Sequence, residues 1–560
     1  MKNYKKVYAA FILAGGLILH GCNGIFDDLA INPNQPSMGA YFTSPSAVND
    51  AVMTMYGYMS TQRCLGASGS KTTIIRSDEA SSNSDYGKPG MFGADLNASY
   101  YTIEQPYTLM YTTASQASYI IETAPSVDFS GNEELRNAYM GEAYFWRAFA
   151  HYYLLINFRN ISPIRQMPRN GDDYVRPLEK PAAVWDFIQE DLAHAKELLP
   201  VKGYWDSKNA GRVTKASAAA LLGKAYLYRS GIEQYYGEDK TTFYSEAAKE
   251  FGDVIDGKYG TYDLTKNYAD NFDVAHENNE ESILEFQFLG DVDNAGFNPG
   301  LATSGLAFDS RGLMLPGAGV GYEGVVHNWL YNAFVNSVDK DGYTDIRMFS
   351  TMIFNDLDAS IHLRNDAGGN PVRLEGPGGY KWEELYPAKN GKEGFATVSN
   401  PLAHSFKAGI RKGIDCSMPT QTEADGTPKL VGVGAGVKEY VYNQPRAHGV
   451  NWRYIRYADV LMMYAESVVS GGTPASNMTP LQAVNKVRGR ANMSELPSVT
   501  MADIQNERIL EFALEGHRFY DLLRWGKLAS RFTELQESDP NFKKFISADD
   551  FKGFVTNKHE

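Results

Sequence analysis

The stretch ALLGKAYLYRSG at residues 220–231, followed by AAKEFGDVI at residues 247–255, carries the pattern that decides the fold of this chain. In both segments small and apolar residues return every three or four positions, which is the period of one face of an α-helix. Ala247 and Phe251 are four positions apart and therefore share such a face. Because small residues let helices approach closely, we expect these two segments to form a pair of packed helices.

The same pattern occurs twice more. GEAYFWRAFA (141–150) is followed by WDFIQEDLAHAKELLP (185–200), and MMYAES (462–467) is followed by LQAVNKVRGRA (481–491). These helix pairs resemble weak tetratricopeptide repeats, in which each pair needs a neighbour to bury its open face. Three matches predict a mainly α fold built on a tetratricopeptide-like helical-repeat scaffold.

Amphipathic periodicity along the whole chain predicts further helices. Ser44 provides an N-cap for the first of them, and Pro45 suits its first turn. The expected helices span residues 47–59, 106–122, 133–158, 183–199, 215–230, 244–255, 456–470, 480–491 and 502–525.

Between roughly residues 260 and 450 the composition changes. Gly and Pro become frequent, as in EGPGGY and LPGAGVGYEG, and a short alternating segment at 282–288 predicts a strand. We expect a loop-rich, partly β insertion laid on the helical scaffold. Long loops on a rigid frame are where binding sites usually lie.

The N-terminus indicates export. Lys2, Lys5 and Lys6 precede an apolar run of 13 residues, Val7 to Leu19, which is too short to span a bilayer and is typical of a removable secretory signal. Cys22 directly after Gly21 resembles a bacterial lipobox, in which the thiol is diacylated and the chain is cut just before it. An ordinary signal peptide with an incidental Cys is the alternative.

Two acyl chains on Cys22 would anchor a soluble domain stably, at about 0.8 kcal/mol per buried CH₂ group. Asp27 and Asp28 resemble the acidic patch that directs Bacteroidetes lipoproteins to the cell surface. The resemblance therefore implies an outer-membrane location, lipid-anchored and surface-exposed.

The overall composition excludes some classes of partner. The chain has 560 residues, 43% hydrophobic and 21% charged, and its formal net charge is −14. Residues 1–21 contain three Lys and no acidic residue, so their removal leaves about −17. Nucleic acid binding needs a positive surface, so we expect neither nucleic acid nor an anionic lipid surface as a partner; the membrane is contacted through the lipid anchor alone.

Cysteine is scarce in this chain, whereas aromatic residues are abundant. After Cys22 only Cys64 and Cys416 remain, which allows at most one disulfide and no thiolate metal site; whether they pair stays open. The chain has 36 Tyr, 28 Phe and 7 Trp, an aromatic content of 13%. Most should fill the core, while a minority present flat faces suited to the C–H faces of sugar rings or to peptide side chains.

Three motifs each have a structural and a functional interpretation. Glu507, Glu511 and Glu515 lie four positions apart on one helix face, which suits acid–base chemistry or metal, but ion pairs with nearby arginines are the ordinary explanation. Gly319 to Gly324 matches G-x-G-x-x-G, yet the preceding LMLPGAG is a poor strand, so a loop is favoured over a nucleotide site.

The third motif, RSDEASSNSDYG at residues 76–87, gathers Asp78, Glu79 and Asp85. A glycosidase needs two carboxylates across a cleft. A polar surface loop, or a loop that binds sugar hydroxyls, makes the same pattern. A calcium ion on these oxygens is a further alternative, although their spacing does not match a helix–loop–helix calcium loop. We expect no cofactor.

The C-terminal blocks carry a family resemblance. NWRYIRYADVLMMYAES (451–467), AVNKVRGRA (483–491) and NERILEFALEGHRFYDLLRWGKL (506–528) strongly resemble the SusD/RagB family of outer-membrane lipoproteins. Supporting blocks are NPNQPS, WRAFAHYYLLINF, GRVTKASAAALLGKAYLYRSG and NNEESILEFQF, which occur in the family's order. One departure is INFRNISPI (156–164), where relatives usually have Gly after the Phe and this chain has Arg159.

The resemblance implies a SusD-like fold and a non-enzymatic role. Such proteins capture an oligosaccharide, or a peptide in some members, above a TonB-dependent SusC-like transporter for nutrient uptake. The candidate ligand-binding residues are Asn83, Asp85, Tyr86, Tyr322, Trp329 and Trp382. Capture of a peptide or another nutrient, a surface glycosidase and a purely structural adaptor are the alternatives.

These observations divide the chain into five expected parts. They are a lipoprotein signal peptide (1–21), a lipid-anchored tether (22–43), an N-terminal SusD-like helical region (44–260), a loop-rich ligand-binding insertion (261–450) and a C-terminal SusD/RagB helical region (451–560).

Overall fold

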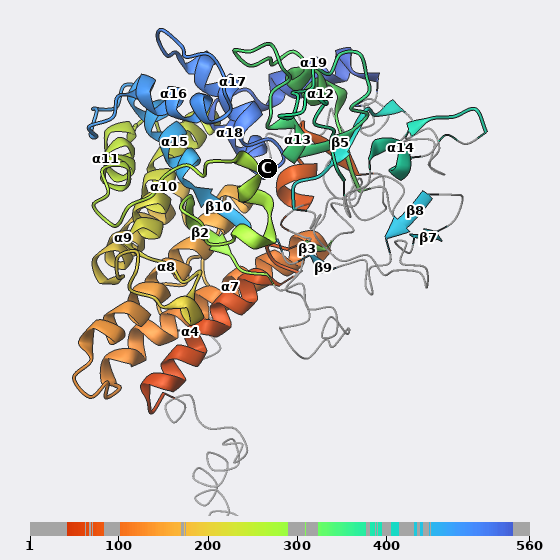
Figure 1. Cartoon of the computed structure of the whole chain (residues 1–560). Helices are drawn as coiled ribbons and strands as arrows, with labels where there is room; N and C mark the ends of the chain where they lie inside the picture. Colours follow the sequence, from red (N-terminus) through yellow and green to blue (C-terminus); the bar gives the residue numbers. More distant parts are fainter. Residues whose placement is uncertain are drawn as a thin grey trace, which may run out of the picture.

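The computed structural model is mainly helical, in agreement with the predicted fold class (Figure 1). It describes residues 42–61, 63–66, 69, 71–82, 101–167, 169, 173, 175–288, 308–309, 323–376, 381–386, 388, 390–394, 405–413, 430–433, 437–440, 447–448, 450–540 and 542. None of the helices in these ranges is long and apolar enough to cross a membrane.

The helices form a stack in which neighbours in sequence pack against each other. In this helical stack α8 (Glu133–Phe158) packs against α9 (Pro181–Leu198), α9 against α10 (Lys215–Tyr236), and α10 against α11 (Tyr244–Ile255). Two more helices, α4 (Pro45–Ser60) and α7 (Tyr101–Thr123), continue the stack beyond α8. This order confirms the predicted helical-repeat scaffold.

The insertion is looped out of a continuous stack. Helix α11 packs directly against α15 (Tyr457–Val469), and α15 packs against α16 (Pro480–Arg490), although residues 256–456 lie between α11 and α15. The two ends of the insertion pair as an antiparallel ladder of β2 (Ser282–Phe286) and β10 (Trp452–Arg456). In Figure 1 the stack occupies the left side, and β5, β7, β8 and α14 of the insertion lie on the right.

Glycine permits the close helix contacts that the sequence predicts. A Cβ atom on Gly223 of α10 would lie 2.8 Å from the ring of Phe251 on α11. A Cβ on Gly252 of α11 would overlap the carbonyl oxygen of Ala475. Since buried interiors pack densely, a larger residue at 223 must push α10 and α11 apart, and one at 252 must displace the loop at Ala475.

The last predicted helix, residues 502–525, is wrong as a single element. The chain forms α17 (Met501–Glu511) and α18 (Arg518–Arg524), and α19 (Leu528–Ser538) follows. The break occurs because Leu514 and Gly516 take φ angles of +62° and +87°. These angles lie in the left-handed region, which no continuous right-handed helix can contain.

A small sheet organises the insertion. Its strand order is β1 (Ala80–Ser82), β4 (Glu323–Val326), β6 (Ala408–Ile410) and β5 (Met352–Phe354), with every neighbouring pair antiparallel. The other described elements of this part are α12 (Asn328–Val335), α13 (Met348–Thr351), α14 (Trp382–Leu385), β3 (Phe308–Asp309) with β9 (Ala447–His448), and β7 (Leu430–Val433) with β8 (Val437–Tyr440). Short helical turns are η1 (Lys71–Ile75), η2 (Ala124–Ser126), η4 (Ser207–Asn209), η5 (Tyr268–Phe272) and η6 (Val274–His276).

Arg159, which stands where relatives usually have Gly, closes α8 in a strained turn. Its φ and ψ are 59° and −72°, and the Asn160 amide donates to the Phe158 carbonyl at 2.7 Å, which together define a γ-turn of the rare kind. The side chain offsets this strain, because its guanidinium donates to both carboxylate oxygens of buried Glu233 at 2.6 and 2.8 Å. It also lies 4.1 Å from the Tyr236 ring centre.

Candidate functional site

The predicted ligand residues divide into two groups in the structure. Trp329 and Trp382 are described. Asn83, Asp85, Tyr86 and Tyr322 lie outside the described residues, as do Gly319 and Gly321 of the glycine motif, Cys416 and the proposed lipid-bearing Cys22.

The described sheet nevertheless relates the two segments that carry these four residues. Ser82 is the last described residue before Asn83, and Glu323 is the first described residue after Tyr322. Ser82 and Glu323 are partners in the β1–β4 ladder. The segments 83–100 and 310–322, far apart in sequence, are therefore attached at neighbouring positions of one sheet.

Trp329, on α12, lies beside the base of β1. Its indole N–H donates to the Asp78 carbonyl at 2.5 Å, and the guanidinium carbons of Arg518 and Arg531 lie 5.3 and 4.3 Å from its ring centre. The side chain is half-buried. The indole N–H thus has a hydrogen-bond partner within the protein, and two arginines lie against the ring. The predicted contact of Trp329 with a ligand stays a prediction.

Asp78 is held by two arginines. Arg518 donates to its two carboxylate oxygens at 2.8 and 3.0 Å, and Arg531 donates to one of them at 2.8 Å. Burial alone would raise the pKa of Asp78, but the charges of Arg518 and Arg531 lower it below its usual value. Asp78 is therefore an ionised and fully paired group.

Glu79 is buried beside it, with 1% of its surface exposed. One of its carboxylate oxygens accepts from the Leu514 amide at 3.0 Å, and its backbone carbonyl accepts from the His327 amide at 2.9 Å. Burial and the charge of Asp78 raise the pKa of Glu79 to about 8. Neither carboxylate faces an open cleft, so this pair does not have the arrangement of a glycosidase.

Trp382 lies in the interior of the insertion. It is 7% exposed, its ring centre is 4.7 Å from that of Tyr386, and a Cβ on Gly394 would lie 2.9 Å from its ring. The sequence could not distinguish this packing from an exposed binding face, because KWEELY suits both. Its predicted contact with a ligand is therefore untested, and in this structure little of the ring is accessible.

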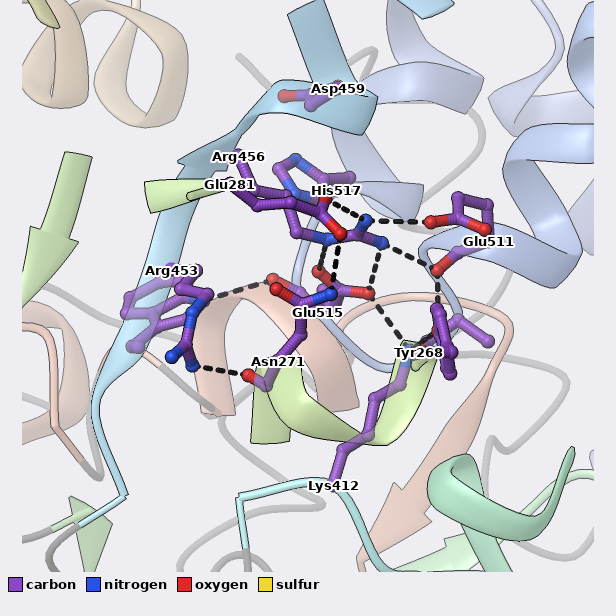
Figure 2. Close-up of polar contacts among 12 residues, drawn as sticks. Tyr268, Asn271, Glu281, Lys412, Arg453, Arg456, Asp459, Glu511, Glu515 and His517 are labelled. Atoms are coloured by element: carbon purple, nitrogen blue, oxygen red, sulfur yellow. Dashed lines mark hydrogen bonds and ion pairs between the residues drawn. The ribbon is translucent and has the colours of Figure 1, made fainter. Parts of the chain in front are cut away.

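A buried network of charges joins the insertion to the C-terminal helices (Figure 2). At its centre Arg456 of β10 contacts Glu511 at 2.6 Å, Glu515 at 2.9 Å and Glu281 at 3.2 Å. Arg490 contacts Glu281 and Glu511 as well. Burial opposes ionisation of Glu511, but its arginine neighbours lower its pKa to about 2. Glu511 and Glu515 therefore form ion pairs, as the structural interpretation of the motif predicts, although Glu515 lies in the turn after α17 and the partners are not the arginines of α17 and α18.

The network extends beyond the acidic residues that the sequence singled out. Arg347 of the insertion contacts Glu507 at 2.5 Å and Glu511 at 3.0 Å, and Lys412 contacts Glu515 at 2.9 Å. Burial lowers the pKa of Lys412 to about 8. Arg347 and Lys412 both lie far from these glutamates in sequence. The sequence indicated them only through the need of three buried carboxylates for counter-charges.

A small cavity lies beside this network. Its space is about 40 Å³, enough for a few water molecules and too small for a sugar ring. Its lining includes Phe272, Lys412, Val450, Trp452, Arg453 and Leu514. Among its polar groups, the Lys412 ammonium already donates to Tyr268, Ala513 and Glu515. This cavity is accordingly not the ligand site.

Within the described ranges, no three His, Cys, Asp or Glu side chains form a group that could hold a metal ion. Asp85 of the calcium alternative lies outside these ranges, and Asp78 is occupied by Arg518 and Arg531. The alternative is untested.

Comparison with known proteins gives a consistent family signal. Residues 421–558 match the model of the SusD family, and residues 31–227 match the model described as starch-binding associating with outer membrane. A SusD-like protein of Bacteroides ovatus is 25% identical over 533 residues, which cover 94% of this chain and 83% of the relative.

Solved structures share the fold. A SusD superfamily protein from Bacteroides vulgatus superposes with a TM-score of 0.63 at 22% identity, covering 90% of this chain and 92% of that one. A laminarin-binding SusD-like protein superposes with a TM-score of 0.60 at 21% identity, covering 90% and 96% of the two chains.

Proposed function

Because the chain belongs to the SusD/RagB family, we propose that it captures oligosaccharides at the outer membrane for nutrient uptake. The protein binds a glycan without cleaving it and delivers it to a TonB-dependent SusC-like transporter. Acylation of Cys22 anchors it to the outer membrane with its folded part exposed at the cell surface. The matched model described as associating with outer membrane supports this location.

One observation of the structure carries the proposal. The β1–β4 pairing of Ser82 with Glu323 attaches the segments of Asn83, Asp85, Tyr86 and Tyr322 to adjacent points of a rigid sheet. Tyr rings provide flat faces for the C–H faces of sugars, and short polar side chains bond to sugar hydroxyls. Segments attached side by side can supply both kinds of contact to one ligand.

The carboxylates near this sheet support a non-catalytic role. Asp78 is paired with Arg518 and Arg531, and Glu79 accepts a hydrogen bond from the Leu514 amide. A hydrolase would need one such carboxyl as a proton donor and a second facing the substrate. Affinity should be modest, since binding a sugar exchanges water for equally polar contacts.

The test is binding of the protein lacking residues 1–22 to a glycan panel that includes laminarin oligosaccharides, measured by calorimetry. We expect one glycan class to bind without the release of new reducing ends. Tyr86→Ala and Tyr322→Ala should each weaken binding roughly tenfold, about 1.4 kcal/mol. Tyr235→Ala is the matched control, because Tyr235 is a half-buried tyrosine of α10 that packs on Tyr236.

The possible results separate the alternatives. Binding of peptides and of no glycan would favour a peptide-capturing family member, and release of reducing ends would favour a glycosidase. If Tyr235→Ala weakened glycan binding as much as Tyr322→Ala, the ligand would have to lie on the helical stack, and the proposed site would be wrong.

A further inference from the structure

Arg76, the residue that follows η1, carries a charge that no carboxylate of the described ranges neutralises. Its guanidinium lies over the Phe519 ring of α18, with the guanidinium carbon 4.1 Å from the ring centre. Its Nη1 donates to the side-chain oxygen of Asn157, near the end of α8, at 3.3 Å. These two contacts use one face and one N–H group of a side chain that has five N–H groups.

The groups that act on this charge are hydroxyls rather than acids. Burial lowers the pKa of Arg76, and the influences that oppose this effect come from the side chains of Tyr520, Tyr236 and Tyr153. A guanidinium nevertheless stays protonated in proteins. Arg76 is therefore a half-buried cation whose neighbours, within the described part of the chain, are neutral.

Other arginines of the protein are compensated. Arg147 pairs with Asp191 at 2.7 Å. Arg212 pairs with Glu142 at 2.5 Å. Arg176 pairs with no carboxylate of the described residues, but it donates to three backbone carbonyls. Arg76 has neither kind of partner in these ranges, although a cation removed from water without a partner costs free energy and needs an explanation.

Tyr236, the last residue of α10, lies beside the same charge. The guanidinium carbon of Arg159 is 4.1 Å from its ring centre, and Arg159 is itself neutralised by Glu233. Burial raises the pKa of Tyr236, while the charges of Arg159 and Arg76 oppose that rise, so both charges lie near its hydroxyl. This hydroxyl makes no hydrogen bond within the described ranges. Arg76 and Tyr236 are both half-buried, so part of each side chain is accessible from the surface.

A cation beside an unused hydroxyl donor is suited to an oxyanion. The planar guanidinium matches two oxygens of a carboxylate or of a sulfate, and such charge-assisted hydrogen bonds are shorter and stronger than neutral ones. Neutral sugar hydroxyls gain less, because they carry no charge to offset that of Arg76. Charge complementarity at this position therefore discriminates between classes of oligosaccharide.

We propose that the ligand of this protein is an anionic oligosaccharide, and that Arg76 and the Tyr236 hydroxyl bind its carboxylate or sulfate group. The inference rests on the proposed glycan-binding function and adds the class of glycan to it. The chain as a whole is acidic, with a formal net charge of −14, so this anion site is a local exception. Its attraction acts at short range, because salt screens charges over longer distances.

The experiment uses calorimetry on the protein lacking residues 1–22, with oligogalacturonate, sulfated carrageenan oligosaccharide and neutral laminarin oligosaccharide as probes. We expect one of the two anionic probes to bind more tightly than the neutral one, which also distinguishes a carboxylate from a sulfate ligand, and added salt to weaken that binding. Arg76→Met removes the charge but keeps an apolar side chain on Phe519. It should weaken binding of that probe at least about tenfold, or about 1.4 kcal/mol. Tyr236→Phe, which removes the hydroxyl alone, should weaken it several-fold.

Arg136→Met is the matched control. Arg136 lies near the start of α8, at the other end of the helix from Asn157, and its loss changes the net charge by the same amount. It should leave the affinity for both anionic probes unchanged. Equal losses of affinity in Arg76→Met and Arg136→Met would mean that only the overall charge matters, and the inference would be overturned.

A readout without ligand separates binding from a structural role. Because Arg76 has no counter-charge in the described ranges, Arg76→Met should unfold at a temperature no lower than that of the unmodified protein. If this variant is destabilised instead, Tyr236→Phe decides, because it changes neither charge nor ring packing. Unchanged affinity of Tyr236→Phe for the anionic probe would then overturn the inference.

The outcomes distinguish this inference from the proposed function. Binding of neutral glycans alone would overturn the anionic ligand and leave glycan capture standing. If no glycan binds, the proposed function fails. Free galacturonate or sodium sulfate should still raise the unfolding temperature more in the unmodified protein than in Arg76→Met if the anion site exists. No such difference, together with no binding of glycans, would overturn both.

Discussion

The helical stack and the junction of the insertion with the C-terminal helices differ in their balance of apolar and charged contacts, although the stack has buried ion pairs of its own, such as Arg147 with Asp191 at 2.7 Å. In the stack, neighbouring helices meet through small residues and aromatic side chains, as Gly223 meets Phe251. The insertion is attached to the C-terminal helices through buried charges, in which Arg456, Arg347 and Lys412 pair with glutamates that the chain supplies from α17 and the following turn. Most contacts of the first kind join helices that follow each other in sequence, with α11 on α15 as an exception, whereas those of the second kind join distant segments.

The two kinds of contact differ in how tightly they fix the geometry of the residues that they join. Apolar packing is non-directional and tolerates shape-conserving change. A buried guanidinium with several carboxylates fixes both distance and orientation, and it becomes costly when any partner is removed. The part of the molecule to which the predicted ligand-binding segments attach is thus the part with the more exacting contacts.

Replacing the central arginine of the network, Arg456, should reduce the stability of the protein more than any other substitution proposed here. Arg456→Met leaves Glu281, Glu511 and Glu515 buried with fewer counter-charges, and we expect a loss of about 3–5 kcal/mol in the free energy of unfolding. The measurement is urea denaturation followed by fluorescence and circular dichroism. Arg136→Met is the control, because Arg136 pairs at 3.5 Å with Glu133, which is 74% exposed; it should change stability by less than about 1 kcal/mol. Equal effects would refute the importance given to the buried network.

A smaller effect is expected from crowding the stack. Gly223→Ala places a methyl group against the Phe251 ring and should destabilise the protein by about 1–3 kcal/mol. Gly57→Ala, in α4, has open space at its Cβ and should stabilise by about 0.5–1 kcal/mol. Thermal unfolding of both variants gives the comparison. Stabilisation by both substitutions would mean that α10 and α11 are not held as closely as the structure has them.

A further effect concerns Glu79 and is a dependence of stability on pH. Its pKa of about 8 in the folded protein lies above the ordinary value of about 4.3, so its contribution to stability is present below that value and is lost as pH rises through 8. Glu79→Gln should remove about 1.4 kcal/mol per pH unit of this dependence between those limits. Denaturation at pH 5, 6.5 and 8 measures it. A parallel pH dependence in the variant and the unmodified protein would show that Glu79 is ionised throughout.

The sequence predicted the stack well because its signals are local. Periodicity, caps and prolines placed α8 and α11 at their observed bounds and most other helices within a few residues. It also predicted correctly that Glu507, Glu511 and Glu515 make ion pairs, but their partners include residues of distant segments and none lies at helical spacing on the same helices.

What could not be predicted depends on contacts between distant segments. Nothing in the local pattern identifies Arg347, Arg490 or Lys412 as the partners of those glutamates. The break at Leu514 was missed because Leu rarely adopts positive φ and is a good helix former. The burial of Trp382 follows from the close approach of Gly394, which is a property of the folded insertion rather than of the aromatic residue.

Hydrogen exchange with and without bound oligosaccharide tests the central claim most directly, because it reports on both regions at once. The account predicts slower exchange on binding in peptides covering residues 83–100 and 310–335, and unchanged exchange across α8–α11. Slower exchange confined to α8–α11, with none in the segments attached to β1 and β4, would contradict it.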